Sequence, residues 1–231
     1  RVGDWELDRH TGRMYWSRQL FRLFDRAEAL GVPDINEALG YTWAEFNRCH
    51  LVEQRTLGPE DAVRLTMGHL GIDLGPDAAR EVSETFGYAI LHYPPEPIEG
   101  ALEAVKAAAE RVPVGVISDS GVSPGRALRA LLERNGFGGL FKALVFSDEV
   151  GVAKPQLPMF QAATSMLNVR LDELLHIGDL EDTDIAGALN VGAQAALFIG
   201  DNPAYGGATR AGRVFASWPE FLAALPGVLG A

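Results

Sequence analysis

Short apolar runs alternate with amphipathic stretches through the second half of the chain. We expect strands at VGVIS, ALVFSDE, ELLHIGD and AQAALFIG, whose apolar centres are typical of strands that are buried on both faces of a sheet. Between them, stretches such as PGRALRALLERNG and PMFQAATSMLNV carry apolar residues at helical spacing. A shorter run, RVFASW, and a helical stretch around PEFLAAL complete the pattern. This alternation predicts a doubly wound α/β domain with a parallel sheet.

The first part of the chain has a different pattern. Residues 15–92 carry helical periodicity, and two of their stretches, LGPEDA and LGPDAA, place proline near a helix start with acids in the first turn. Before them, WEL and MYW flank DRHTGR and predict a small hairpin with Gly12 in its turn. We therefore expect a hairpin at 1–14, a helical module over 15–92 and an α/β core over 93–231.

Charge and composition restrict the class of protein. The 231 residues carry a formal net charge of −11, which argues against binding to a nucleic-acid backbone. The chain has no run of about eighteen apolar residues, so we expect no membrane segment. Cys49 is the only cysteine in the sequence, which excludes an internal disulfide and favours a reducing cytoplasm.

Polar residues follow three of the predicted strands. They are Ser118 and Asp119 after the first, Lys154 after the second and Asp179 after the third. Because ligands of open parallel sheets bind beyond the carboxyl ends of strands, these side chains are expected to share one site. A hydroxyl there can hold a phosphate oxygen, and an ammonium can neutralise its charge. A helix N-cap for Ser118 and a surface position for Lys154 are the alternatives.

Four acidic residues crowd into the stretch GDLEDTDIAGA. Asp179 and Asp184 are placed to hold a hard cation such as Mg²⁺, and Gly178 lets the backbone approach a ligand closely. Glu181 and Asp182 are expected to face solvent or to assist the start of the next helix. Capping acids that favour the helix dipole are the alternative for the whole cluster.

The motifs VPVGVISDSG, VFSDEVGVAKP and LLHIGDLEDTDIAGALNVGA resemble, in order and spacing, those of the haloacid dehalogenase superfamily, whose members are mostly phosphatases. The resemblance covers residues 97–200 and implies a Rossmann-like core, with the helical module as that superfamily's cap. The stretch KPQLPMF departs mildly from the usual KPDP pattern.

The resemblance also implies roles for single residues. Ser118 and Lys154 match the catalytic phosphate-binding residue and lysine, and Asp119 joins them in binding substrate. Asp179 and Asp184 match the carboxylates that hold Mg²⁺. The implied function is a magnesium-dependent phosphatase that acts on a small phosphorylated metabolite through an aspartyl-phosphate. A catalytically inactive binding protein and a 2-haloacid dehalogenase are the alternatives, and a homodimer is left open.

The superfamily's first motif, an apolar strand that ends in Asp-x-Asp, is not visible in RVGDWELDRHTGRMYW. Three alternatives stay open: the strand lies upstream of Arg1, Asp8 is a divergent nucleophile, or the domain is inactive. Because that strand lies centrally in the superfamily's sheet, its loss would leave unpaired backbone groups on both neighbours. His176, inside the third predicted strand, is expected to be a core histidine with a hydrogen-bond partner.

Overall fold

The computed structural model describes residues 5–8, 13–16, 35–200 and 208–230. The chain divides into two compact units. The helical unit comprises Arg1–Pro95 and Ser120–Leu131, and the α/β unit comprises Glu96–Asp119 and Leu132–Ala231. The division differs from the one expected, since the first boundary falls at 95 rather than 92 and residues 120–131 belong with the helices.

The predicted hairpin is present in the helical unit. Strands β1 (Trp5–Asp8) and β2 (Arg13–Trp16) pair antiparallel, with Trp5 opposite Trp16. The helical stretch expected from residue 15 therefore does not begin there, because its first two residues belong to β2. Gly12 and residues 17–34 lie outside the described residues.

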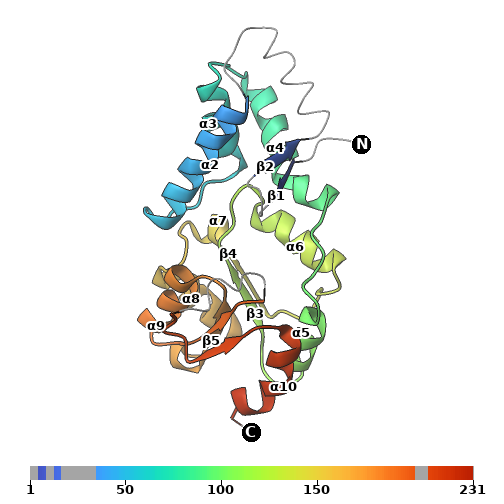
Figure 1. Cartoon of the computed structure of the whole chain (residues 1–231), viewed down its shortest axis with the longest axis vertical. Coiled ribbons are helices and arrows are strands. Elements are labelled where there is room, and N and C mark those ends of the chain that lie inside the picture. The colour runs from blue at the N-terminus through green and yellow to red at the C-terminus, as the bar shows by residue number, and fades with distance from the viewer. Residues whose placement is uncertain (1–4, 9–12, 17–34, 201–207, 231) are drawn as a thin grey trace. The chain divides into compact units, whose positions relative to one another are not determined.

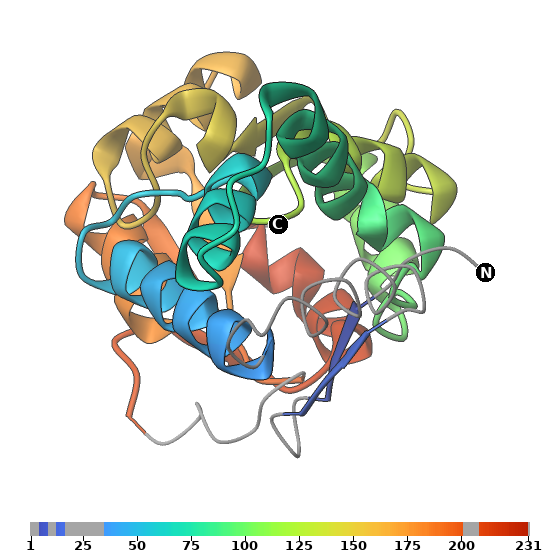
Figure 2. The same cartoon turned by 90° about the horizontal axis from the view of Figure 1, so that it is seen from above.

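Three helices form the body of the helical unit. They are α2 (Ile35–Leu51), α3 (Pro59–His69) and α4 (Pro76–His92). Helices α3 and α4 begin at the two prolines that the sequence pattern indicated, and α3 packs against both α2 and α4 (Figures 1 and 2). Their apolar faces form one buried cluster of Ala38, Val63, Met67, Leu70 and Phe86.

Packing explains why residues 120–131 belong to the helical unit. Val122 packs against its buried cluster. Arg126, in α6 (Gly125–Arg134), donates hydrogen bonds to the Tyr88 hydroxyl at 3.1 Å and to Glu84 at 3.0 Å. These partners lie 38 and 42 residues away in sequence, so local periodicity could not reveal them.

The strands of the α/β unit form two parallel groups. Strand β3 (Gly115–Ser118) pairs with β4 (Ala143–Phe146). Strand β5 (Leu175–Gly178) pairs with β6 (Gln194–Phe198), which pairs in turn with β7 (Arg213–Phe215). The five strands lie within the predicted strand segments, and the pairing is parallel as predicted.

Helices cover both faces of these strands (Figure 1). Ala195 and Leu197 of β6 join the buried cluster that contains residues of α8, and Ala196 and Phe198 join the cluster that contains residues of α5 and α10. The helices are α5 (Ala101–Ala109), α8 (Leu157–Leu167), α9 (Ala186–Asn190) and α10 (Trp218–Val228). The doubly wound, Rossmann-like α/β architecture is confirmed. No helix in the described part of the chain is both long and apolar enough to cross a membrane.

Two local elements differ from the sequence prediction. The residues SDE, expected to extend β4, instead begin the helical turn α7 (Ser147–Val150), which ends at Gly151 with φ 88°. The helix expected after β5 starts with a π-helical turn, η2 (Glu181–Ile185), before α9. A further 3₁₀ turn, Leu171–Glu173, precedes β5.

The inner strands β3 and β5 each keep one open edge. Among the described residues, the one strand partner of β3 is β4, and the one strand partner of β5 is β6. All four residues of β3 are only half-buried, whereas most residues of β4 and β6 are buried. Within the described part of the chain, one edge of β3 and one edge of β5 therefore have no strand partner.

Candidate active site

Lys154 lies at the carboxyl ends of the inner strands. Its ammonium Nζ is 2.5 Å from Asp184 Oδ1 and 3.3 Å from the Ile117 carbonyl oxygen in β3. Its backbone N–H donates to Asp119 Oδ1 at 2.8 Å, and Asp119 Oδ2 lies 4.0 Å from Nζ. Lys154 is only 8% exposed, which excludes the alternative of an ordinary surface lysine.

Asp184 is a buried carboxylate with a donor on each oxygen. Besides Lys154, His176 Nε2 lies 2.8 Å from Oδ1, and the Leu180 N–H donates to Oδ2 at 3.0 Å. Burial by itself would raise the pKa of Asp184, but the His176 hydrogen bond and the Lys154 charge lower it well below its usual range. Asp184 is therefore ionised at neutral pH.

The Asp184 side chain packs directly against the backbone of Gly178. A Cβ atom at this position would lie 2.2 Å from Asp184 Cγ and 2.6 Å from Oδ1. The sequence indicated that Gly178 lets a ligand approach the backbone, whereas the structure shows the Asp184 side chain in that space.

Gly178→Ala should therefore displace Asp184 and lower the free energy of unfolding by about 1–3 kcal/mol, as overpacking does in other cores. Urea denaturation measures this change. Gly68→Ala in α3 is the control, because a Cβ there meets nothing within 4 Å and alanine favours the helix. Equal stability of Gly178→Ala and the unaltered protein would contradict the packing argument.

Ser118 and Asp119 follow one another where β3 ends. Ser118 is half-buried, and α6 begins only at Gly125, so Ser118 is not the N-cap of that helix. The expected helix entrance is therefore displaced from Ser118, and a loop separates them. Asp119 contacts the backbone of Lys154 and so joins the β3 end to the loop that carries the lysine.

Three other acids of the cluster have distinct surroundings. Asp179 follows β5 directly and is half-buried, and Asp182 is exposed, as expected. Glu181 differs from expectation, because its carboxylate accepts hydrogen bonds from the Thr209 hydroxyl at 2.7 Å and from the Arg210 N–H and Nε at 3.0 Å. Burial raises the pKa of Glu181, but these hydrogen bonds outweigh it and lower that pKa.

Glu181→Ala should release the segment that follows residue 208 and reduce the free energy of unfolding by about 1 kcal/mol, since the lost bonds are partly exposed. The amide protons of Arg210 and Ala211 should exchange faster with solvent, which hydrogen-exchange mass spectrometry measures. Asp182→Ala, at an exposed neighbouring acid, should leave both quantities unchanged. Unaltered exchange in Glu181→Ala would show that the hydrogen bonds of Glu181 with Thr209 and Arg210 do not order this segment.

Asp179 and Asp184 are the metal ligands that the sequence predicted. Within the described ranges, no group of three or more His, Cys, Asp or Glu side chains could hold a metal ion by itself. Mg²⁺ usually keeps several waters and binds through one or two carboxylates together with substrate phosphate. Asp179 is half-buried at the end of β5, and both oxygens of Asp184 accept hydrogen bonds.

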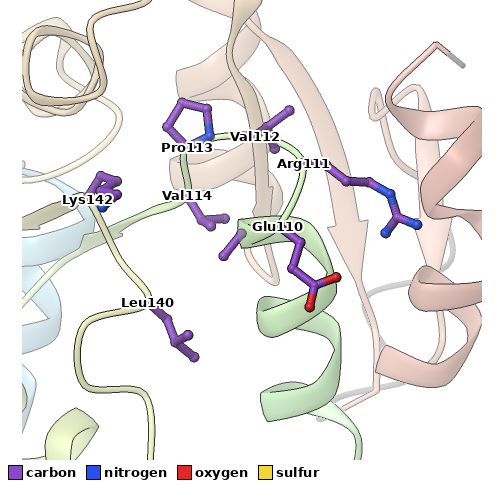
Figure 3. A pocket seen from close by; sticks show the side chains of 8 residues that line it. Glu110, Arg111, Val112, Pro113, Val114, Leu140 and Lys142 are labelled. Carbon is purple, nitrogen blue, oxygen red and sulfur yellow. The ribbon is translucent and has the colours of Figure 1, made fainter.

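A separate hollow of about 320 Å³ lies at the amino end of β3 (Figure 3). Residues 109–114 line it together with Leu140 and Lys142. The Arg111 side chain points away from Lys142, so the two cations do not converge on a shared ligand position. The hollow lies before β3, whereas Lys154 contacts the residues that end this strand.

Comparison with known proteins agrees with this geometry. A sequence model of the haloacid dehalogenase-like hydrolases matches residues 53–192, more than half of the chain. The chain belongs to the haloacid dehalogenase-like hydrolase family. Ser118, Lys154, Asp179 and Asp184 all lie within the matched segment.

Two curated haloacid dehalogenase-like relatives come from Escherichia coli strain K12. The pyrimidine 5'-nucleotidase YjjG is 36% identical over 97 residues, which span 42% of this chain and 42% of the relative. The 5-amino-6-(5-phospho-D-ribitylamino)uracil phosphatase YigB is 30% identical over 100 residues, which span 43% of this chain and 39% of the relative. The matched segments thus span less than half of either relative.

A solved structure shares the haloacid dehalogenase-like fold. The 2-haloacid dehalogenase from Pseudomonas syringae pv. Tomato DC3000 superposes with a TM-score of 0.65 at 18% identity. The superposition covers 99% of this chain and 94% of that one. At this identity the likeness concerns the fold.

The structure brings some of the predicted residues together and adds others. Lys154 contacts Asp184 and Asp119 through hydrogen bonds, while Ser118 and Asp179 are placed by the strands that they end or follow. His176 was expected to be a core histidine with a partner, and that partner is the predicted site residue Asp184. Its position two residues before Gly178 in the same strand, hence on the same face, was the available signal.

Proposed function

We propose that this protein is a magnesium-dependent phosphomonoesterase that acts on small phosphorylated metabolites through an aspartyl-phosphate intermediate. The observation that carries the proposal is the buried ammonium of Lys154 at the carboxyl ends of β3 and β5. A fixed cation in a partly desolvated site stabilises the charge that develops on a transferring phosphoryl group. The similarity to two curated relatives, a nucleotidase and a phosphatase, supports this reaction class.

The residues have separate roles in the proposal. The hydroxyl of Ser118 binds a phosphate oxygen, and Lys154 neutralises both the phosphate and the attacking carboxylate. Asp119 binds substrate through the backbone groups around it and holds the Lys154 loop by its side chain, in agreement with the 2.8 Å hydrogen bond. Asp179 and Asp184 provide the carboxylates that would hold magnesium.

Magnesium would supply charge neutralisation for the phosphoryl oxygens. Asp179 would hold it directly, because its carboxylate is half-buried at the strand end. The oxygens of Asp184 accept hydrogen bonds from Lys154, His176 and Leu180, so Asp184 would contact the ion through water.

The nucleophile would be a carboxylate on a strand between β3 and β5, the position that the described residues leave open. Its oxygen would attack phosphorus, and the ester oxygen would leave with a proton. Water would then break the acyl phosphate and release inorganic phosphate, which regenerates the carboxylate. Asp8 in β1 is the alternative nucleophile, and its side chain lies outside the described residues.

The site residues, the net charge and the single cysteine support a substrate class and a cellular compartment for the proposal. A site that recognises phosphate through one hydroxyl and one buried ammonium suits small anionic metabolites, and the net charge of −11 disfavours nucleic acid. The single cysteine, Cys49, is buried and fits a reducing cytoplasm. Light scattering would measure the oligomeric state and would distinguish a homodimer from a monomer.

The test is a panel of phosphomonoesters and short 2-haloacids, assayed for released phosphate or halide with and without magnesium. We expect phosphate release that requires magnesium and no halide release. Halide release would favour the dehalogenase alternative. The absence of both, with a folded protein that still binds inorganic phosphate, would favour the inactive binding protein.

A further inference from the structure

His176 is a buried group beside the site to which the proposed chemistry assigns no role. It lies in β5 and is 8% exposed. The ring of Phe160 packs against it edge to face, with the ring centres 5.5 Å apart and the planes at 85°. This packing fixes the plane of the imidazole, and its Nε2 atom is 2.8 Å from Asp184.

The direction of that hydrogen bond follows from the other donors around Asp184. The Lys154 ammonium donates to Oδ1 and the Leu180 N–H donates to Oδ2, so the carboxylate acts as an acceptor through both oxygens. His176 Nε2 therefore carries the proton and donates it to Oδ1. The same oxygen accepts from Lys154, whose ammonium also donates to the Ile117 carbonyl. A continuous set of hydrogen bonds thus joins β5 to β3 through Asp184 and Lys154.

We infer that His176 is a positioning residue that fixes the Lys154 ammonium at the strand ends by holding Asp184 in one orientation. A lysine side chain is a flexible four-carbon stem, so its ammonium is placed by its acceptors. Asp184 is the nearest of these acceptors, and its Oδ1 has His176 as the second donor. Removal of that donor would leave a buried carboxylate oxygen incompletely satisfied and free to turn.

The test measures the position of Lys154 directly. His176→Leu removes the donor and keeps an apolar side chain, whereas His176→Gln keeps an N–H donor at a similar reach. The chain contains three lysines, Lys106, Lys142 and Lys154, and the first two are exposed. Lysine acylation followed by peptide mass spectrometry therefore reports on Lys154 with two internal references in each sample.

We expect Lys154 to react more slowly than Lys106 and Lys142 in the unaltered protein. Its acylation should be faster in His176→Leu and return to the slow rate in His176→Gln. Val145→Ala is the control for general loosening, because Val145 is buried in the same cluster as Phe160 and makes no part of the hydrogen-bonded set. Unchanged acylation in His176→Leu, or equal acceleration in Val145→Ala, would overturn the inference.

A kinetic measurement deepens the test and rests on the proposed phosphomonoesterase function. In His176→Leu, kcat should fall about tenfold, as is typical for a group that orients a site residue, with KM little changed and kcat restored in His176→Gln. If the unaltered protein hydrolyses no phosphomonoester, the proposed function fails, and the acylation rates still decide the role of His176. If kcat falls equally in His176→Gln, the donor is not what matters and the inference is wrong.

Discussion

Replacement of Lys154 by methionine should lower kcat for phosphomonoester hydrolysis by about 10²-fold or more, because it removes the fixed charge that stabilises the transferring phosphoryl group. Methionine fills a similar volume in a site where the side chain is 10% exposed. Asp184 keeps its hydrogen bonds from His176 and Leu180, so the fold should survive with reduced stability. Steady-state kinetics and thermal unfolding measure the two effects.

The matched control is Lys142→Met, since Lys142 is exposed and lies before β4 rather than at the strand ends. Its kcat should equal that of the unaltered protein. Lys154→Arg is a second variant that keeps the charge but changes its geometry, and it should fold while losing activity. If Lys154→Met raises only KM, Lys154 is a binding contact and its proposed role in the chemical step is wrong.

Asp179→Asn should abolish the magnesium-dependent part of the activity, a loss of about 10²-fold or more, because a neutral amide is a poor ligand for a hard cation. Asp179 is half-buried after β5, so the substitution should leave the secondary structure intact. The measurement is the initial rate as a function of magnesium concentration, with circular dichroism as the check on folding.

Asp182→Asn serves as the control, because this exposed acid lies in the same cluster and removes the same charge. It should shift the magnesium dependence little. Full activity of Asp179→Asn at saturating magnesium would remove Asp179 from the metal site. An equal loss in both variants would mean that the general negative charge of the cluster matters rather than one ligand.

The order of strands and helices in the α/β unit could be predicted because each apolar run is local. The five runs coincide with β3 to β7, and proline marked the starts of α3 and α4. The hairpin was predicted from WEL and MYW, and β1 and β2 pair antiparallel as a hairpin requires. These features depend on neighbouring residues, which a sequence pattern records.

The contacts that build the site could not be predicted in the same way. Lys154 and Asp184 are 30 residues apart, and Glu181 meets Thr209 across 28 residues. The sequence placed Lys154 and Asp184 at strand ends but not against each other. It predicted that Glu181 faces solvent or assists the start of the next helix, and it did not predict the contact with Thr209. Such pairs depend on how strands lie side by side, for which a single sequence carries no direct signal.

The unpaired edges of β3 and β5 in the structure correspond to a motif that is not visible in the sequence. The sequence lacks a visible apolar strand ending in Asp-x-Asp, and among the described residues no strand pairs with these edges. All four residues of β3 are half-buried, whereas the sequence predicted a buried strand. In the proposed function, the strand that carries the nucleophile would also pair with these edges.

The most direct test of the phosphomonoesterase proposal is to stop the reaction with acid during the first turnovers and map the phosphoryl group by peptide mass spectrometry. The proposal predicts an acid-stable, hydroxylamine-sensitive phosphoryl group on one aspartate, formed with magnesium and lost in Lys154→Met. Its position would also distinguish Asp8 from a carboxylate on a strand between β3 and β5. Phosphate release without any phosphorylated aspartate would contradict the proposed aspartyl-phosphate route.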